Sequence, residues 1–135
     1  SGSAGGSPGF WRGKVLAPYS GDELVYNATL GDWRTHNGVD VAAAAGEKVP
    51  AVRAGHVTLV DADALWGGVV EVSDAGGRVW RYCGVDGSCV VGDAVAAGDV
   101  LGTAGAIPAE ADLDGHVHLE CLEGDGSTWV EPGIK

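Results

Sequence analysis

The sequence predicts an all-β fold, a single domain of antiparallel strands arranged as a β sandwich or barrel-sandwich. Glycine contributes 24 of the 135 residues, far above its usual share of about 7%. Without a collagen-like period, so many glycines indicate many tight turns between short strands. Runs of β-forming residues alternate with these turns, and no segment of useful length has helical periodicity. The length suits one domain with its own core.

The first clear strand is Val57-Thr58-Leu59-Val60, in which simple alternation places Val57 and Leu59 on one face. The strongest hairpin signal follows, where residues 69–72 and 78–82 are β-rich runs on either side of Ser73-Asp74-Ala75-Gly76-Gly77. Trp80 lies within this hairpin, and we expect it in the core.

The last strand covers residues 116–121 and has two chemically different faces. Val117, Leu119 and Cys121 form an apolar face that we expect in the core. His116, His118 and Glu120 alternate with them on the opposite face.

A weak internal repeat relates Gly46–Gly55 to Gly92–Asp99, since each segment carries glycine, an acidic residue, valine and a second glycine. Such paired segments suit a duplicated hybrid motif, in which two hairpin units wrap together. They also occur in biotinyl and lipoyl carrier domains, which need a modifiable lysine at a hairpin tip. The three lysines are Lys14, Lys48 and Lys135, and none lies in a plausible hairpin turn.

The formal net charge of −11 argues against nucleic acid and anionic membrane surfaces as partners. No methionine is present, which indicates a fragment or a processed product. Residues 1–9 are typical of a flexible linker or cloning remnant, so the predicted domain covers residues 10–135. No apolar run approaches the roughly 20 residues of a membrane helix, although a membrane anchor could precede residue 1.

The three cysteines do not form a paired array. A bridge between Cys83 and Cys89 is one alternative, and buried or free thiols are the favoured one.

The histidines suggest a metal site. His116 and His118 point to one face of a strand, and two neighbouring imidazoles are natural metal ligands. Upstream, His36 and Asp40 lie four residues apart around Gly38, which allows a bend that turns both toward one point. His56, out of phase with its apolar neighbours, is expected to be a solvated strand residue.

These motifs resemble the LytM, or lysostaphin-type, zinc metallopeptidases. The resemblance rests on His36-x-Gly38-x-Asp40, on Gly92-Asp93-x-Val95-x-x-Gly98-x-x-Leu101-Gly102 and on Gly115-His116-x-His118-x-Glu120. It implies a LytM-like β sandwich and one zinc ion per chain, held by His36, Asp40 and His118. It also implies that His116 is a catalytic histidine acting on the metal-bound water, and that the substrates are peptide cross-links of peptidoglycan.

The sequence departs from this family at the second catalytic histidine. The family has Tyr-x-His-Leu after the hairpin, whereas this chain has Tyr82-Cys83-Gly84-Val85 and no histidine between His56 and His116. Gly84, or Tyr82 if the register is shifted, therefore stands at the lost catalytic position. Loss of a general base or oxyanion donor typically lowers the rate by about 10²–10⁴-fold. Two hypotheses follow: a degenerate, zinc-binding interaction module, or an active zinc endopeptidase that uses His116 alone.

A narrower resemblance favours the first hypothesis. Residues 22–30 and the run Asp32-Trp33-Arg34-Thr35-His36 resemble the stage II sporulation protein Q group of LytM-like domains. That group implies a protein anchored in the forespore membrane, with its LytM domain facing the intermembrane space. There it binds the ring-forming domain of stage III sporulation protein AH. Trp66, in a turn-rich loop, is the candidate interface residue, and the negative charge would steer the domain toward a basic partner.

Overall fold

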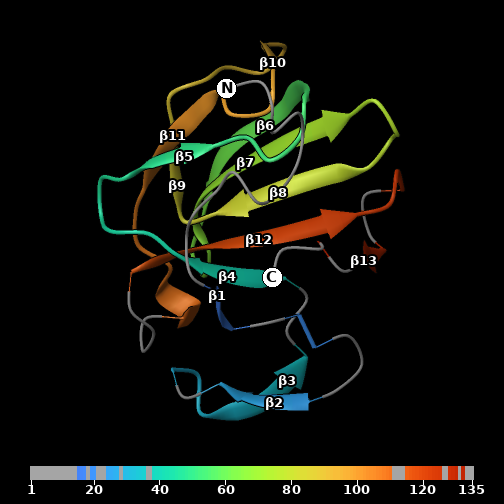
Figure 1. Cartoon of the computed structure of the whole chain (residues 1–135). Coiled ribbons are helices and arrows are strands. Elements are labelled where there is room, and N and C mark those ends of the chain that lie inside the picture. The colour runs from blue at the N-terminus through green and yellow to red at the C-terminus, as the bar shows by residue number, and fades with distance from the viewer. Residues whose placement is uncertain are drawn as a thin grey trace.

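A computed structural model describes residues 15–17, 19–20, 24–27, 29–35, 38–110, 115–125, 128–130 and 132. These residues form strands and one short 3-10 turn (Figure 1). The strands are β1 (Val15–Ala17), β2 (Leu24–Asn27), β3 (Asp32–Thr35), β4 (Val39–Ala42), β5 (Lys48–Pro50), β6 (Gly55–Asp63), β7 (Gly67–Asp74), β8 (Val79–Cys83), β9 (Val85–Gly87), β10 (Ala94–Val95), β11 (Val100–Ala104), β12 (His116–Leu122) and β13 (Trp129–Val130), and the 3-10 turn is η3 (Pro108–Glu110). The expected linker at residues 1–9 lies outside the described residues.

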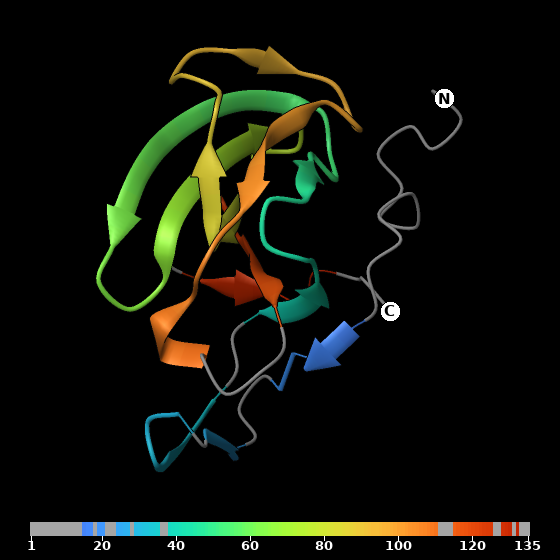
Figure 2. The same ribbon diagram turned by 90° about the vertical axis from the view of Figure 1, so that its left-hand side faces the viewer.

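The core lies between two antiparallel sheets. The larger sheet has the order β1-β4-β12-β8-β7-β6-β10, with β13 added beside β12, and the smaller has the order β5-β11-β9. Figure 2 shows the larger sheet curling strongly along β6 and β7, with the smaller sheet across from it. Core side chains come from both sheets, including Val49 and Leu101 from the smaller and Val72, Tyr82 and Leu119 from the larger. The predicted all-β sandwich is confirmed.

The predicted hairpin is confirmed as β7 and β8, whose register pairs Val72 with Trp80. Trp80 is buried, as expected. The side chain of Asp74 organises the turn between these strands. Its Oδ1 accepts hydrogen bonds from the backbone N–H groups of Gly76 and Arg78, and its Oδ2 accepts one from the Trp80 indole. Burial raises the pKa of Asp74, but these hydrogen bonds outweigh it and hold the pKa below the usual 3.8.

We expect Asp74→Ala to lower the free energy of unfolding by about 2 kcal/mol at pH 7, because it removes three hydrogen bonds from one turn. A lowered pKa contributes stability above the unfolded pKa, and that contribution is lost as the pH falls through the folded pKa. The difference between variant and wild type should therefore shrink below about pH 3.8. Urea unfolding at pH 7 and pH 3 measures both effects. Asp61→Ala, which removes one hydrogen bond to the adjacent backbone, is the control, and an equal loss in both variants would contradict the role of Asp74.

The alternation predicted for β12 is confirmed. Val117, Leu119 and Cys121 belong to the hydrophobic core, and the opposite face carries His116, His118 and Glu120. All seven residues of β12 are buried, and the strand lies between β4 and β8 in the sheet. Both faces of β12 are thus shielded from water.

The prediction that Val57 and Leu59 share a face is wrong. Val57 pairs with Val72, but Leu59 pairs with Glu71, so Thr58 is an extra residue that forms a β-bulge. A bulge inverts the alternation of the strand beyond it. Val57 accordingly lies in the core, whereas Leu59 lines a pocket on the outer face together with Glu71. His56, as expected, is exposed.

The two segments of the weak internal repeat, Gly46–Gly55 and Gly92–Asp99, are neighbours in space. The N–H of Ala51 donates to the carbonyl of Asp99, and the N–H of Gly98 donates to the carbonyl of Ala51. Lys48 begins β5 and pairs with Thr103 of β11, so it is not at a hairpin tip and the carrier-domain alternative gains no support. Lys14 and Lys135 lie outside the described residues.

The three cysteines are free thiols, so the structure contains no bridge between Cys83 and Cys89. Within the described part of the chain, no helix is long and apolar enough to cross a membrane.

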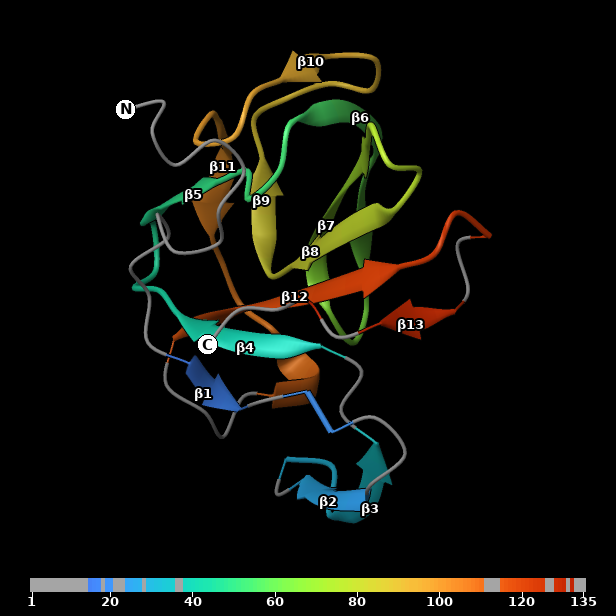
Figure 3. The ribbon, with the colours of Figure 1, turned by 45° about the vertical axis from the view of Figure 1, so that its right-hand side comes forward.

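The strands β2 and β3 form a separate two-stranded sheet. Figures 1 and 3 show this hairpin apart from both sheets of the sandwich, on the side where β1 and β4 lie. Its register pairs Tyr26 with Trp33, and the two rings meet edge to face with centroids 5.6 Å apart.

Candidate metal centre

The pairing of β4 with β12 brings together two residues that are 78 positions apart. His118 is directly opposite Asp40 in the register, and its Nδ1 lies 2.7 Å from Asp40 Oδ1. Both side chains are buried, at 1% and 0% exposure. Two of the three predicted zinc ligands therefore meet in a buried part of the sheet, whereas the third, His36, lies outside the described residues.

Gly38 is required here for a different reason from the bend expected from the sequence. The chain does bend at Gly38, but its φ is not in the left-handed region, so the bend itself does not require glycine. A Cβ at this position would lie 2.5 Å from the carbonyl oxygen of Leu119 and 2.8 Å from His118 Nε2. Glycine is needed because β12 and the His118 ring pass too close for any side chain.

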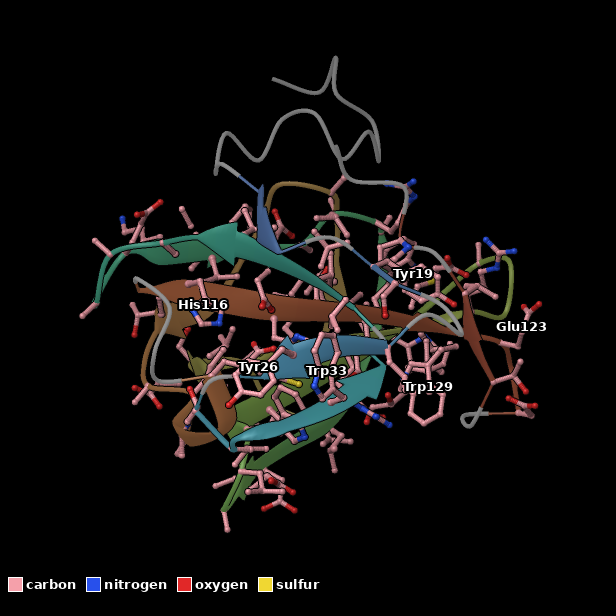
Figure 4. The ribbon with its side chains drawn as sticks, turned by 90° about the horizontal axis from the view of Figure 1, so that it is seen from below. Tyr19, Tyr26, Trp33, His116, Glu123 and Trp129 are labelled. Carbon is pink, nitrogen blue, oxygen red and sulfur yellow. The ribbon has the colours of Figure 1, made fainter. Side chains whose placement is uncertain are left out.

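His116, labelled in the view from below the sandwich in Figure 4, reaches the same site. Its Nε2 lies 3.8 Å from Asp40 Oδ2 and 2.9 Å from Glu110 Oε1. Glu110 Oε1 is also 3.5 Å from His118 Nδ1. Glu110 was not among the predicted site residues; it ends the 3-10 turn η3, and no short motif of the sequence singles it out.

A chain of hydrogen bonds orients the His118 ring through its Nε2 atom, the ring nitrogen that does not contact Asp40. Its Nε2 lies 3.0 Å from Glu120 Oε2. Glu120 Oε1 in turn accepts hydrogen bonds from Arg81 at 3.0 Å and from the Trp129 indole at 3.1 Å, and Arg81 also donates to Glu71 at 2.8 Å. A carboxylate that accepts the Nε2 proton fixes the tautomer and leaves Nδ1 as the donor atom for a metal.

The same contacts set the charges of the metal-free site. Burial lowers the pKa of His118, but its hydrogen bonds to Asp40, Glu110 and Glu120 outweigh this and raise the pKa well above 6.5. Burial raises the pKa of Glu120, but the contacts with His118, Trp129 and Arg81 outweigh it and lower the pKa. A metal that binds Nδ1 must therefore displace a proton from the ring.

Trp66 covers this histidine. Its indole stacks on the His118 ring with centroids 4.4 Å apart and planes 25° apart. Asp63 Oδ1 holds the turn in place by accepting hydrogen bonds from the N–H groups of Leu65 and Trp66. Trp66 is only half-buried, so it shields the site on one side and also presents an edge to solvent.

Gly84 follows β8, beside the backbone of His116. Its φ is +82°, and a Cβ there would overlap Cγ1 of Ile107 and lie 2.7 Å from its Cδ1. Ile107 is buried, at 5% exposure. Its side chain thus occupies the space beside the position where the family has its second histidine.

The neighbouring Cys83 does not supply a ready metal ligand. Its thiol is buried, and burial raises its pKa far above the usual 9.0, whereas metals bind the thiolate.

The buried donors are of the kinds that zinc takes. Asp40, Glu110 and His116 each offer one atom within 4.8 Å of the others, and His118 Nδ1 adjoins two of them. Imidazole nitrogen and carboxylate oxygen are common zinc ligands. The set of donors therefore fits a zinc ion.

The family model of peptidase family M23 matches residues 34–132, a span that includes every candidate site residue. The chain belongs to peptidase family M23. This agrees with the LytM resemblance. M23 is a zinc-dependent family, and the buried donors described above form a possible metal-binding group.

Solved structures show the same fold for this M23 domain. A chain of the SpoIIQ–SpoIIIAH pore-forming complex is 24% identical, with a TM-score of 0.73, over 88% of this chain and 80% of that one. The catalytic domain of the antimicrobial peptidase lysostaphin from Staphylococcus simulans is 23% identical, with a TM-score of 0.72, over 89% of each chain.

A zinc-containing peptidase from Vibrio cholerae is 22% identical, with a TM-score of 0.73, over 90% of this chain and 36% of that one. No curated protein sequence matches the chain significantly.

Proposed function

We propose that this M23 domain is a zinc-binding module with impaired or absent peptidase activity, and that it binds a SpoIIIAH-like protein as SpoIIQ does. The observation that carries the proposal is the position of Gly84. The second catalytic histidine is absent from the sequence, and Ile107 fills the adjacent space. A domain packed in this way would lack one of the two catalytic histidines of the family, although the three proposed metal ligands are present in its sequence.

His36, Asp40 and His118 are the proposed zinc ligands, with one zinc per chain. The 2.7 Å approach of Asp40 to His118 and the anchoring of His118 by Glu120 support this assignment. When bound, zinc would act as a Lewis acid toward a carbonyl in an active enzyme and as a clamp between β4 and β12 in an inactive one. In either case His118 must release its Nδ1 proton, and Glu120 keeps the ring oriented.

The alternative is an active zinc endopeptidase that cleaves peptidoglycan cross-links. One observation favours it: His116 is buried with its Nε2 directed into the cluster, 3.8 Å from Asp40, where a general base belongs. Against it stands the missing partner at Gly84, without which a rate loss of about 10²–10⁴-fold is expected.

The β2–β3 hairpin is the proposed contact surface for the partner. Of the ten exposed large apolar side chains in the described residues, five come from this hairpin and its turn: Leu24, Val25, Tyr26, Leu30 and Trp33. Figure 4 shows Tyr26 and Trp33 next to each other. Exposed apolar patches of this kind mark protein interfaces, and aromatic residues are frequent interface anchors. Trp66 is a second proposed contact, through its exposed edge.

The same proposal places the domain at the extracytoplasmic face of a bacterial membrane. In an endospore former this would be the forespore membrane, facing the intermembrane space, with attachment through an anchor outside this sequence. A net charge of −11 favours a basic partner surface and an association rate that falls with salt.

We expect Trp33→Ser to weaken binding to the extracytoplasmic domain of the SpoIIIAH-like protein of the same bacterium by about tenfold or more. Trp33 is 65% exposed, so its replacement removes contact area without opening a cavity in the core. Surface plasmon resonance at two salt concentrations measures the affinity and the electrostatic contribution. Val90→Ser is the matched control, because Val90 is 63% exposed and lies outside the hairpin.

Equal affinity of both variants and wild type would remove the hairpin from the interface. No binding by the wild type, combined with cleavage of purified peptidoglycan, would overturn the proposed function in favour of the peptidase.

A further inference from the structure

We propose that Glu110 is a fourth protein ligand of the metal, so that this chain closes with its own carboxylate the coordination position that a hydrolytic site leaves open. The inference rests on the proposed zinc site and adds a ligand to it. Catalytic zinc sites have three protein ligands and one open position, whereas sites with four protein ligands are structural.

The position of Glu110 Oε1 carries this inference. In a hydrolytic site, the oxygen that His116 orients must lie within hydrogen-bond distance of its Nε2 and beside the ligand atoms. Glu110 Oε1 satisfies both conditions, at 2.9 Å from His116 Nε2 and 3.5 Å from His118 Nδ1. The carboxylate oxygen thus stands where the reacting oxygen would be.

The separations between donor atoms also suit one ion. With bonds of about 2.0–2.1 Å, atoms around a tetrahedral zinc lie roughly 3.3–3.5 Å apart. The distance from Glu110 Oε1 to His118 Nδ1 falls in this range, and Asp40, Glu110 and His116 offer atoms within 4.8 Å of one another. Glu110 therefore needs little movement to share an ion with Asp40 and His118.

The fold holds Glu110 in this place. The N–H of Gly105 donates to the carbonyl of Gly84, and the N–H of Glu110 donates to the carbonyl of Ile107. Between them, Ile107 packs on Gly84. One segment, residues 105–110, thus fills the space beside the lost histidine and directs Glu110, which is 6% exposed, into the cluster.

Charge balance supports the same conclusion. Asp40 and Glu110 are two buried carboxylates, and a divalent cation bound to both would balance their negative charges. Buried charges are otherwise strongly unfavourable. Glu120, the third buried carboxylate of the site, has its own cation in Arg81 and is not needed for this balance.

Cobalt substitution tests the proposal without an activity assay. The metal-free domain is loaded with one equivalent of Co²⁺, and its visible spectrum is recorded before and after addition of acetohydroxamate, a chelating ligand that requires an open position. We expect the wild-type spectrum to stay unchanged and that of Glu110→Ala to shift. The zinc dissociation constant, measured by competition with a chelating dye, should rise by about tenfold or more in Glu110→Ala.

Two further variants make the result specific. Glu110→Gln keeps the length and polarity of the side chain but lacks the anionic donor, so it should behave as Glu110→Ala does and serves in its place if the alanine variant does not fold. Glu123→Ala removes an exposed glutamate of a surface ion pair and should behave as wild type.

The experiment distinguishes failure of the zinc proposal from failure of the Glu110 assignment. A wild type that binds neither zinc nor cobalt overturns the zinc proposal and this inference with it. A wild type that binds zinc, but whose cobalt spectrum already responds to acetohydroxamate and does not depend on Glu110, overturns this inference alone and leaves the other ligands in place.

Discussion

Asp40→Ala is expected to abolish stoichiometric zinc binding and to lower the melting temperature of the zinc-loaded domain by about 10 °C. The variant loses a proposed ligand and leaves His118 Nδ1 without the oxygen that lies 2.7 Å away. A ligand present at about 100 times its dissociation constant stabilises the native state by about 2.7 kcal/mol. For a domain of this size, that corresponds to a shift of roughly 10 °C.

Metal analysis of the purified protein and thermal unfolding with and without chelator measure the two effects. Asp93→Ala is the matched control, because this exposed aspartate accepts a single hydrogen bond from the backbone of Val90. If wild type melts at the same temperature with and without chelator, zinc has no structural role. If Asp40→Ala retains one zinc per chain, Asp40 is not a ligand.

The parts of the fold that depend on local pattern could be predicted from the sequence. The β7–β8 hairpin follows from β-rich runs around an Asp-Gly turn, and the faces of β12 follow from simple alternation. The orientation of Leu59 could not be predicted, because the bulge at Thr58 appears only in the pairing with β7. Alternation is a reliable guide to a strand only as far as its register is continuous.

The residues of the candidate site likewise include some that the sequence could predict and one that it could not. Asp40, His116 and His118 could be selected because a short motif carries each of them. Glu110 could not, because its place depends on how residues 105–110 pack against Gly84, a contact between segments far apart in the sequence. The sequence likewise indicated that a histidine was missing, but not that Ile107 had taken the space beside it.

Because Ile107 occupies the space beside Gly84, we expect Gly84→His to lower the free energy of unfolding by about 2–5 kcal/mol. The substitution should not restore peptidase activity. The backbone has a φ of +82°, which costs a residue with a Cβ about 1–2 kcal/mol. Overlap with the buried Ile107 side chain adds about 1–3 kcal/mol. Urea unfolding measures the loss, and incubation with purified peptidoglycan and a pentaglycine peptide should show no cleavage.

Gly77→His separates the two contributions, because Gly77 has a similar φ of +87° but no atom lies within 4 Å of the point where its Cβ would stand. The free energy of unfolding of Gly77→His should therefore fall only by the cost of the positive φ. Ile107→Ala should be destabilising in the wild-type background by about 2–5 kcal/mol, yet less so beside Gly84→His, where the smaller side chain relieves the overlap. A coupling of about 1 kcal/mol or more is expected. If Gly84→His is instead as stable as Gly77→His and cleaves peptidoglycan, then a single substitution separates this domain from an active enzyme, and Ile107 is no obstacle to that histidine.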